Sequence, residues 1–251
     1  MLPDNPLPHL RILCMFLRMN DLKQPSHDSS GRVVAIDGPA GSGKSTTARL
    51  VAARLGYQYL DTGAMYRAVT WHALQNKIAP SDANTLAEFA ESAEIRFETH
   101  EDVNRVFLNG TDITKEIRTP EVTKHVSEIS AHKGVREAMV RKQQEIGRTG
   151  HIVAEGRDTT TVVFPQAFLK VYLDASVSTR ARRRLKDLQS MGIPSSIDEQ
   201  EADLKRRDHY DSTRKHSPLT RADGAVVVDT TDMSIEGQVD YIIDLVHQLA
   251  S

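Results

Sequence analysis

The segment at residues 38–45, with the sequence GPAGSGKS, constrains the fold of this chain more than any other feature. It has the form G-x-x-x-x-G-K-[ST], whose glycines allow backbone N–H groups to surround a phosphate group. The apolar run RVVAID at residues 32–37 precedes it and is typical of a central parallel strand. A helical pattern follows it and ends at Gly56, a residue suited to a helix C-terminus. The pattern therefore predicts a phosphate-binding loop between a strand and a helix.

This loop indicates where a nucleoside triphosphate and its metal would bind. Lys44 would reach the β- and γ-phosphates of ATP, and the Ser45 hydroxyl would bind Mg²⁺. Asp37 and Glu155 are alternative partners for the water ligands of that metal. The predicted ATP-binding residues are Gly38, Pro39, Ala40, Gly41, Ser42, Gly43, Lys44, Ser45 and Thr46.

Strand and helix patterns continue to alternate along the chain. Further strand-like runs lie at residues 57–61, 151–154, 169–174 and 225–229. Strands that alternate with helices predict right-handed βαβ units. The fold class that we expect is therefore α/β, with a parallel five-stranded sheet of the P-loop NTPase type flanked by helices. Residues 79–146 interrupt this pattern as an insertion, in which residues 94–99 and 104–108 predict an antiparallel hairpin or meander.

A second anion site is indicated by DTGAMYR at residues 61–67. Thr62 is a candidate helix cap, and Tyr66 and Arg67 would lie near the same helix N-terminus, which suits a monophosphate. The same residues are compatible with an ordinary cap, a packed tyrosine and a solvated arginine. The segment alone leaves both interpretations open.

An arginine-rich run covers Arg180 and residues 182–184. It could form a solvated helix face, an RNA-binding face or a mobile lid over ATP. No aromatic residue lies within this run, and the phosphate-binding loop favours the lid. The predicted catalytic residues are Lys44, Arg180, Arg183 and Arg184.

Composition and one missing motif exclude other classes of function. The net charge of −2 gives no general attraction to nucleic acid or to anionic lipid, so we expect neither as a partner. The single cysteine, Cys14, excludes an internal disulfide and favours a reducing cytoplasm. The run at residues 10–17 is too short to span a bilayer. The segment NKIA at residues 76–79 lacks the aspartate of a guanine-reading N-K-x-D motif, which argues against a GTPase. We expect a monomer.

Five motifs together resemble the bacterial cytidylate kinases, members of the nucleoside monophosphate kinase superfamily. They are IDGPAGSGKST (36–46), LDTGAMYRA (60–68), EIRTPEV (116–122), EGRDTTTVVFP (155–165) and LDASVSTRARRR (173–184). The resemblance runs from about residue 32 to the C-terminus. It implies ATP-dependent, Mg²⁺-assisted phosphorylation of CMP and dCMP, and small nucleotides as partners.

The resemblance also implies roles for individual residues. The CMP phosphate would be held by Thr62, Tyr66, Arg67 and Arg157. The cytosine ring would be read by Ser127, Arg136 and Asp158. The ribose and phosphate would be approached by Arg207, Asp211 and Arg214. The chain departs from the family pattern at Glu155, where many relatives have aspartate, and at Thr62, where serine is common. Both changes keep the functional group.

The predicted domain organisation follows from these motifs. Residues 19–31 are polar and rich in turn formers, and we expect residues 1–31 to form a disordered extension. For its first 18 residues two alternatives stay open: a start site placed too far upstream, or a functional N-terminal extension. Residues 32–60, 147–179 and 193–251 would form the core, 61–146 the monophosphate-binding region and 180–192 the lid. Two alternative functions stay open: another small-molecule P-loop kinase, and a non-catalytic nucleotide- or RNA-binding regulator.

Overall fold

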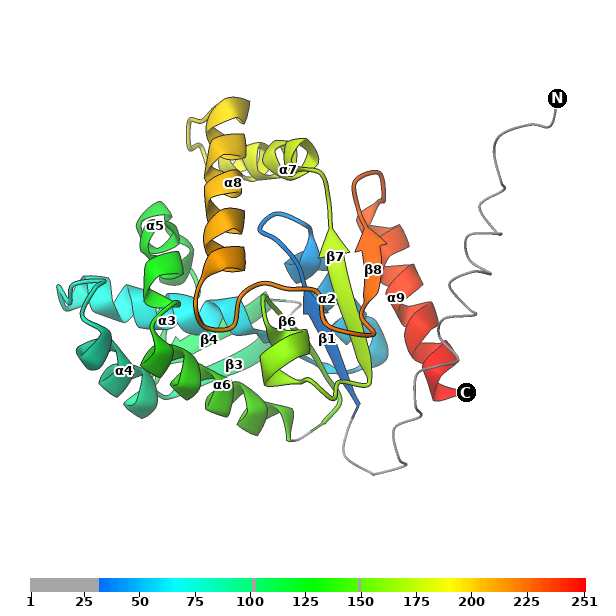
Figure 1. The fold of residues 1–251 in the computed structure, drawn as a ribbon, viewed down its shortest axis with the longest axis horizontal. Coiled ribbons are helices and arrows are strands. Elements are labelled where there is room, and N and C mark those ends of the chain that lie inside the picture. Colours follow the sequence, from blue (N-terminus) through cyan, green and yellow to red (C-terminus); the bar gives the residue numbers. More distant parts are fainter. Residues whose placement is uncertain (1–31, 101–102, 149) are drawn as a thin grey trace.

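The centre of the molecule is a five-stranded sheet in the order β2-β6-β1-β7-β8 (Figure 1). The computed structural model describes residues 32–100, 103–148 and 150–251, so the predictions for residues 1–31 lie outside the described residues. Every neighbouring pair of strands in this sheet is parallel, which confirms the predicted fold class. The strands are β1 (Val33–Asp37), β2 (Gln58–Asp61), β6 (Ile152–Gly156), β7 (Leu169–Asp174) and β8 (Val226–Asp229).

Two hydrophobic cores cover the two faces of this sheet. Successive strand residues point to opposite faces, so Val34 and Ile36 join one core while Ile152 and Ala154 join the other. The first core packs α2 (Lys44–Leu55) and α9 (Ile235–Ala250) against the sheet. The second packs α3 (Thr62–Gln75) and α6 (Lys133–Gly147) against it. Strands covered on both faces require the nearly continuous apolar runs seen in the sequence.

The strand register brings several polar residues to one edge of the sheet. Asp61 lies opposite Glu155, and Asp37 lies opposite Gly156 on one side and Tyr172 on the other. Asp37, Asp61 and Gly156 are the last residues of their strands, and Glu155 is the next-to-last residue of β6. Ligands of open α/β sheets bind at this edge, so the topology indicates where the functional site lies.

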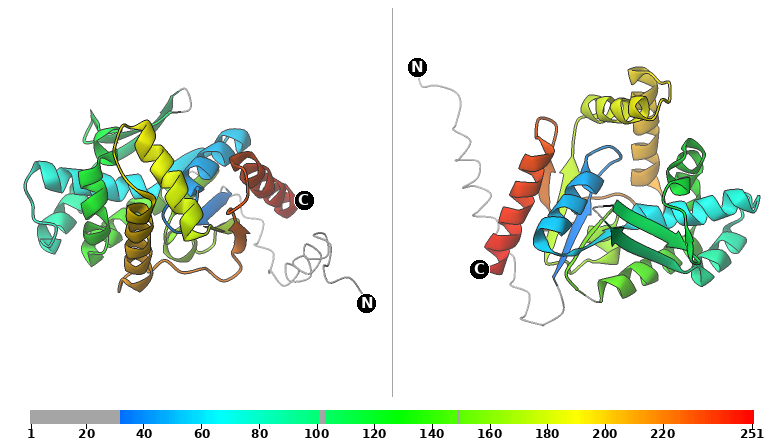
Figure 2. Two further views of the ribbon diagram at one scale, coloured as in Figure 1. Left: turned by 90° about the horizontal axis from the view of Figure 1, so that it is seen from above. Right: turned by 180° about the vertical axis from the view of Figure 1, so that it is seen from behind.

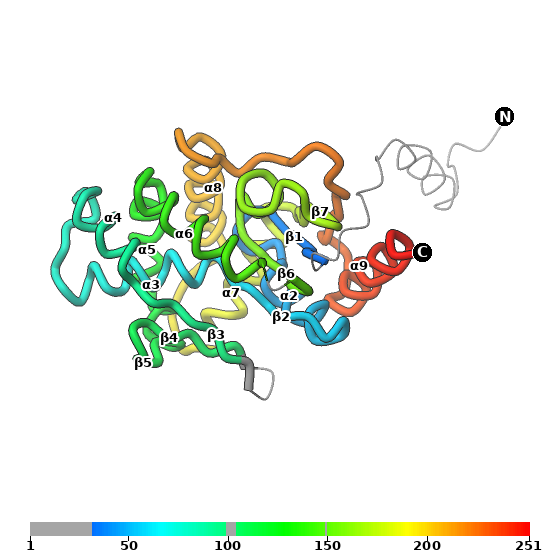
Figure 3. The backbone as a smooth tube through the Cα atoms, turned by 90° about the horizontal axis from the view of Figure 1, so that it is seen from below, coloured from blue at the N-terminus to red at the C-terminus, as the bar shows by residue number. Residues whose placement is uncertain are grey.

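The described residues of the insertion form a small antiparallel sheet and four helical segments, the last of which is α6. Strands β3 (Ile95–His100), β4 (Val103–Leu108) and β5 (Thr111–Asp112) form the predicted meander. The segment η1 (Glu116–Arg118) and helix α5 (Pro120–Ile129) follow it. Helix α4 (Ala83–Ser92) was not predicted, although Leu86, Phe89 and Ala90 recur at helical spacing and Asp82 caps its start. In Figures 1 and 3, α4 and α9 lie at opposite ends of the molecule.

Helices α7 (Val177–Ser190) and α8 (Ile197–Thr213) pack against each other at a steep angle above the carboxyl edge of the sheet (Figures 1 and 2). Gly192 follows α7 with a positive φ of 70°, and a capping box between Ser196 and Glu199 begins α8. Most of the predicted lid, residues 180–192, therefore belongs to a regular helix packed on α8. In the part of the chain that the structure describes, no helix has the length and apolar character needed to cross a membrane.

Candidate nucleotide site

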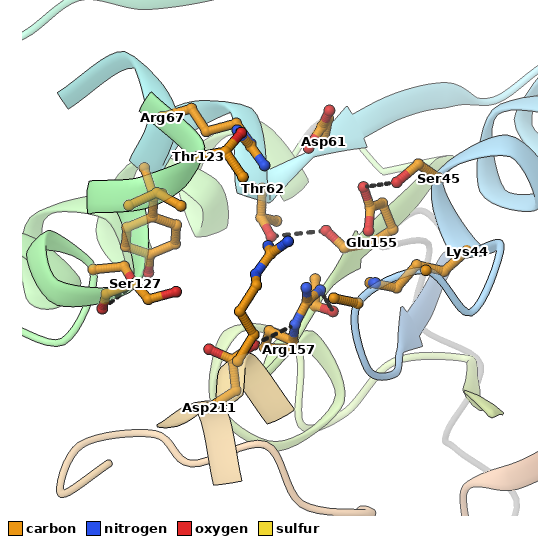
Figure 4. A pocket seen from close by; sticks show the side chains of 18 of the residues that line it. Lys44, Ser45, Asp61, Thr62, Arg67, Thr123, Ser127, Glu155, Arg157 and Asp211 are labelled. Carbon is orange, nitrogen blue, oxygen red and sulfur yellow. Dashed lines mark hydrogen bonds and ion pairs between the residues drawn. The ribbon is translucent and has the colours of Figure 1, made fainter. Parts of the chain in front are cut away.

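A cavity of about 560 Å³ opens at the carboxyl edge of the sheet. Figure 4 shows Lys44 and Ser45 on one side of it, and Arg67 and Ser127 on the other. Five carboxylate side chains line the cavity, against eight arginines and one lysine, which suits a ligand with several negative charges. The lining arginines are Arg67, Arg118, Arg136, Arg157, Arg183, Arg184, Arg207 and Arg214.

The phosphate-binding loop has the geometry expected of an anion cradle. Gly43 precedes α2 in the left-handed conformation with φ 94°, and no side chain caps the N–H groups of this helix. Those N–H groups, together with the helix dipole, favour an anion at this position. Gly38 must be glycine, because a Cβ there would lie 2.1 Å from the carbonyl oxygen of Leu173.

Lys44 lies inside the cradle and is only 5% exposed. Its Nζ donates to the backbone oxygen of Pro39 at 3.0 Å. Burial, followed by the positive charge of Arg157, lowers the pKa of Lys44 to about 7. A bound phosphate would place a negative charge beside this ammonium group and stabilise its charged form.

The oxygen atoms nearest the loop fit a hard cation such as Mg²⁺. Ser45 Oγ donates to Glu155 Oε1 at 2.7 Å. Burial, and then the neighbouring charge of Asp61, raise the pKa of Glu155. A hydroxyl and two carboxylates therefore lie together where a cation would relieve their repulsion. Sequence reasoning missed Asp61, although its place at the end of a predicted strand was a usable signal.

Asp37 does not reach this group of oxygens. It is fully buried and accepts four hydrogen bonds from Thr159 and Thr160. Glu155 is therefore the better of the two predicted partners for the metal's water ligands. Within the described residues, no cluster of three or more His, Cys, Asp or Glu side chains could hold a metal by itself.

At the second anion site, two hydrogen bonds fix the position of the Arg67 guanidinium. Its Nη1 donates to Thr123 Oγ1 at 2.9 Å and to the backbone oxygen of Ile117 at 3.3 Å. Burial, and then the positive charge of Arg207, lower the pKa of Arg67 to about 10. Arg157, which donates through Nε to Asp211 at 2.8 Å, lies nearby (Figure 4).

The predicted cap of α3 was wrong by one residue. Asp61 is the N-cap, and its carboxylate accepts from the Ala64 N–H at 2.9 Å. Thr62 begins the helix, and its hydroxyl donates to the backbone oxygen of Glu155 at 2.7 Å. Thr62 nevertheless lines the cavity.

A buried polar group lies at the far end of the cavity. Arg136 and Asp158 form an ion pair, and each is only 3% exposed. Arg214 approaches the same carboxylate at 3.8 Å, and the Arg136 guanidinium lies 5.1 Å from the centre of the Tyr66 ring. Ser127 lines this part from α5. The buried nitrogens of Arg136 (Nε) and Arg214 (Nη2) and the Tyr66 hydroxyl have no hydrogen-bond partner among the described residues, so a polar ligand fits here.

The three predicted lid arginines differ in position. Arg183 and Arg184 line the cavity, and Arg183 Nη2 donates to the backbone oxygen of Thr230 at 2.6 Å. Arg180 does not line it, because its guanidinium is held by the backbone oxygens of Ala175 and Ala40 and by Asp208. Sequence reasoning also missed four polar lining residues: Arg118, Thr123, Ser130 and Asp187.

Comparison with known proteins gives a consistent result. The family model described as cytidylate kinase matches residues 34–248. A cytidylate kinase of Listeria monocytogenes is 48% identical over 212 residues, covering 84% of this chain and 94% of that protein. A cytidylate kinase of Enterococcus faecalis is 47% identical over 215 residues, covering 86% and 95%.

Bifunctional relatives and solved structures also match. A bifunctional pantoate ligase/cytidylate kinase of Trichormus variabilis is 51% identical over 223 residues. The match covers 87% of this chain but only 42% of that protein, so this chain spans less than half of its length. Among solved structures, a shikimate kinase from Bacteroides thetaiotaomicron aligns with 86% of this chain and 98% of its own, at 12% identity and a TM-score of 0.45.

Proposed function

The chain belongs to the cytidylate kinase family, the nucleoside monophosphate kinases that phosphorylate CMP at the expense of ATP, and we propose that its cavity carries out that transfer with the residues described above. ATP would lie with its phosphates in the loop at residues 38–46. CMP or dCMP would lie at the arginine-rich end.

At the donor end, Lys44 and the loop N–H groups hold the β- and γ-phosphates. Ser45, with Glu155 and Asp61 behind it, would hold Mg²⁺, which when bound neutralises charge on the phosphate oxygens. Arg183 and Arg184 reach the cavity from α7, and we assign them to the transferring phosphoryl group. Arg180 instead supports the loop through the Ala40 carbonyl oxygen. We propose that residues 180–192 move as a lid, together with the part of α8 on which they pack.

At the acceptor end, Arg67 and Arg157 would bind the CMP phosphate. Arg207 adds a further positive charge, and its buried Nε has no hydrogen-bond partner among the described residues. Phosphoryl transfer proceeds through a loose transition state, so the main contributions are in-line positioning and charge neutralisation. The acceptor is already an anion at neutral pH and needs no general base.

The base would lie against the Arg136–Asp158 pair. A carboxylate can accept from the N4 amino group of cytosine, and a guanidinium can donate to its O2 and N3 acceptors. Uracil presents O4 and N3–H instead, so the same pair would bind it less well. Ser127 would complete the set of polar contacts.

The observation that carries this proposal is a single cavity that joins Lys44 to the buried Arg136–Asp158 pair. A coupled assay of ADP release with CMP, dCMP, UMP and AMP tests it. We expect turnover with CMP and dCMP to exceed that with AMP by several orders of magnitude. Equal rates with all acceptors would indicate a different small-molecule kinase, and ATP binding without transfer would indicate a regulator.

We also propose that the enzyme is a monomer in the cytoplasm. The absence of any internal disulfide in a chain with one cysteine supports the location. Light scattering coupled to size-exclusion chromatography tests the oligomeric state.

A further inference from the structure

Asp37 is a buried carboxylate that the proposed chemistry does not use. It ends β1 directly before the phosphate-binding loop and is 0% exposed. Burial is the main reason that its pKa is raised. No lysine or arginine among residues 32–100, 103–148 and 150–251 forms an ion pair with it. A buried carboxylate is costly unless it is fully hydrogen-bonded, so its four partners require an explanation.

Those partners are the backbone and side chain of two successive threonines. The N–H and hydroxyl of Thr159 donate to one carboxylate oxygen at 2.9 and 2.6 Å. The N–H and hydroxyl of Thr160 donate to the other at 2.7 and 2.6 Å. Both threonines are buried, and they are 122 and 123 residues away from Asp37 in sequence. We name this arrangement the Asp37 clamp.

The Asp37 clamp holds the start of an unusual backbone segment. Thr159 and Thr160 begin η2 (Thr159–Val163), a single π-helical turn, and this turn has no side-chain cap from its own N-cap residue, Asp158. The first N–H groups of a helix have no partner within the helix, and here Asp37 supplies one from another strand. π-helical turns are rare and occur often at functional sites.

The residues directly before this turn are the proposed acceptor ligands. Arg157 and Asp158 connect the end of β6 to Thr159. A shift of the turn would therefore move the guanidinium that faces the CMP phosphate and the carboxylate that faces the base. We propose that Asp37 is a positioning residue that fixes the acceptor site by holding Thr159 and Thr160, an inference that rests on the proposed CMP site.

The phosphate-binding loop is held by hydrogen bonds from other residues, so loss of the bonds between Asp37 and the two threonines should affect CMP binding and not ATP binding. The Ala40 carbonyl oxygen accepts from Arg180 at 3.0 Å. The Ser42 carbonyl oxygen accepts from the Thr230 hydroxyl at 3.0 Å and from Arg183 at 3.3 Å. Strand β1 is also paired on both sides along its length. The clamp should therefore matter for CMP and hardly for ATP.

Substitution of the threonines tests the clamp without removing the buried charge. The double variant Thr159→Val/Thr160→Val keeps the shape of both side chains and removes two of the four donors. We expect the KM for CMP to rise by about tenfold or more, as for a buried acceptor left short of partners, and the KM for ATP to stay within about twofold. The ratio of kcat/KM for CMP over UMP should fall as well, because Asp158 moves with the turn.

Three controls separate positioning from general destabilisation. The double variant Thr159→Ser/Thr160→Ser keeps both hydroxyls and should retain the wild-type KM for CMP. Thr161→Val removes a hydroxyl from the same turn that does not contact Asp37 and donates only a long hydrogen bond, at 3.4 Å, to the backbone oxygen of Asp158; it should change the KM for CMP by less than the single variants Thr159→Val and Thr160→Val do. If the double valine variant does not fold, the two single valine variants and Asp37→Asn take its place, with CMP affinity measured by calorimetry.

Parallel changes in the KM values for CMP and ATP would overturn the proposal, as would an unchanged KM for CMP in folded valine variants. Loss of CMP affinity in the serine variant equal to that in the valine variant would also overturn it. If the wild-type enzyme does not phosphorylate CMP at all, the proposed function fails. The test of the Asp37 clamp is then whether the valine variants weaken the binding of a nucleoside monophosphate more than the binding of ATP.

Discussion

The replacement Asp158→Asn tests the base-reading site, because it keeps the side-chain volume and removes the charge. Asp158 is enclosed by two arginines, Arg136 in an ion pair and Arg214 at 3.8 Å, and all three side chains are at most 4% exposed. Removing one member of a buried ion pair costs about 3–5 kcal/mol, and we expect the lower end because an amide oxygen still accepts from Arg136. For a domain of this size, about 3 kcal/mol lowers Tm by roughly 6–12 °C.

The effect on catalysis should depend on the acceptor. CMP loses the carboxylate that accepts from its N4 amino group, which costs about 1–3 kcal/mol, or roughly 5- to 150-fold in kcat/KM. UMP should lose less, because the asparagine amide can donate to its O4 atom. Steady-state kcat/KM for both acceptors, measured well below the lowered Tm, should therefore show the CMP-to-UMP ratio falling by about tenfold.

Arg67→Ala is the matched control for this experiment. It removes a phosphate contact that every monophosphate shares, so it should lower kcat/KM for CMP and UMP by the same factor. If Asp158→Asn also lowers both acceptors equally, Asp158 does not read the base. That result would refute the assignment of the pocket even if phosphoryl transfer itself stands.

Three further predictions concern the donor end. Lys44→Met should lower kcat by at least about a hundredfold, as for a lost preorganised charge. Its Tm should not fall, because burial lowers the pKa of Lys44 and so disfavours the ammonium form in the free enzyme. Steady-state kinetics and thermal melts check the two expectations. Binding of Mg·ATP should take up close to one proton at about pH 8.5 and almost none at about pH 5.5, because the pKa of Lys44 is about 7 in the free enzyme and rises when phosphate binds. Calorimetry in buffers of different ionisation enthalpy measures this uptake. Lys44→Met should abolish it. Glu155→Gln should raise the Mg²⁺ concentration needed for half-maximal rate while leaving the KM for CMP nearly unchanged, and a magnesium titration showing no shift would remove Glu155 from the metal site.

The sheet and the phosphate-binding loop were predictable because their signals are local. Buried parallel strands need apolar runs, and the loop needs its glycines at fixed spacing. Helix α4 was missed although its signal is also local: Asp82 caps its start, and Leu86, Phe89 and Ala90 recur at helical spacing. The cap of α3 was misplaced because Asp61 and Thr62 are adjacent residues that both suit the N-cap.

The roles of Arg180 and Asp37 were not predictable from local pattern. Arg180, Arg183 and Arg184 share one helix face, but Arg180 lies about one turn nearer the start of α7 and meets the Ala40 carbonyl oxygen instead of the cavity. Asp37 was a candidate for the metal site because an acid next to a phosphate-binding loop often serves a cation. Its hydrogen bonds to Thr159 and Thr160 depend on tertiary structure that no local motif encodes.

Binding of a bisubstrate analogue, adenosine and cytidine joined through five phosphates, tests most directly whether one cavity holds both substrates. Isothermal titration calorimetry should give one molecule bound per chain, with tight affinity that is lost in competition with either ATP or CMP. The analogue with adenosine at both ends should bind far more weakly, because adenine cannot satisfy the Arg136–Asp158 pair. Equal affinity for the two analogues, or competition with ATP alone, would contradict the account.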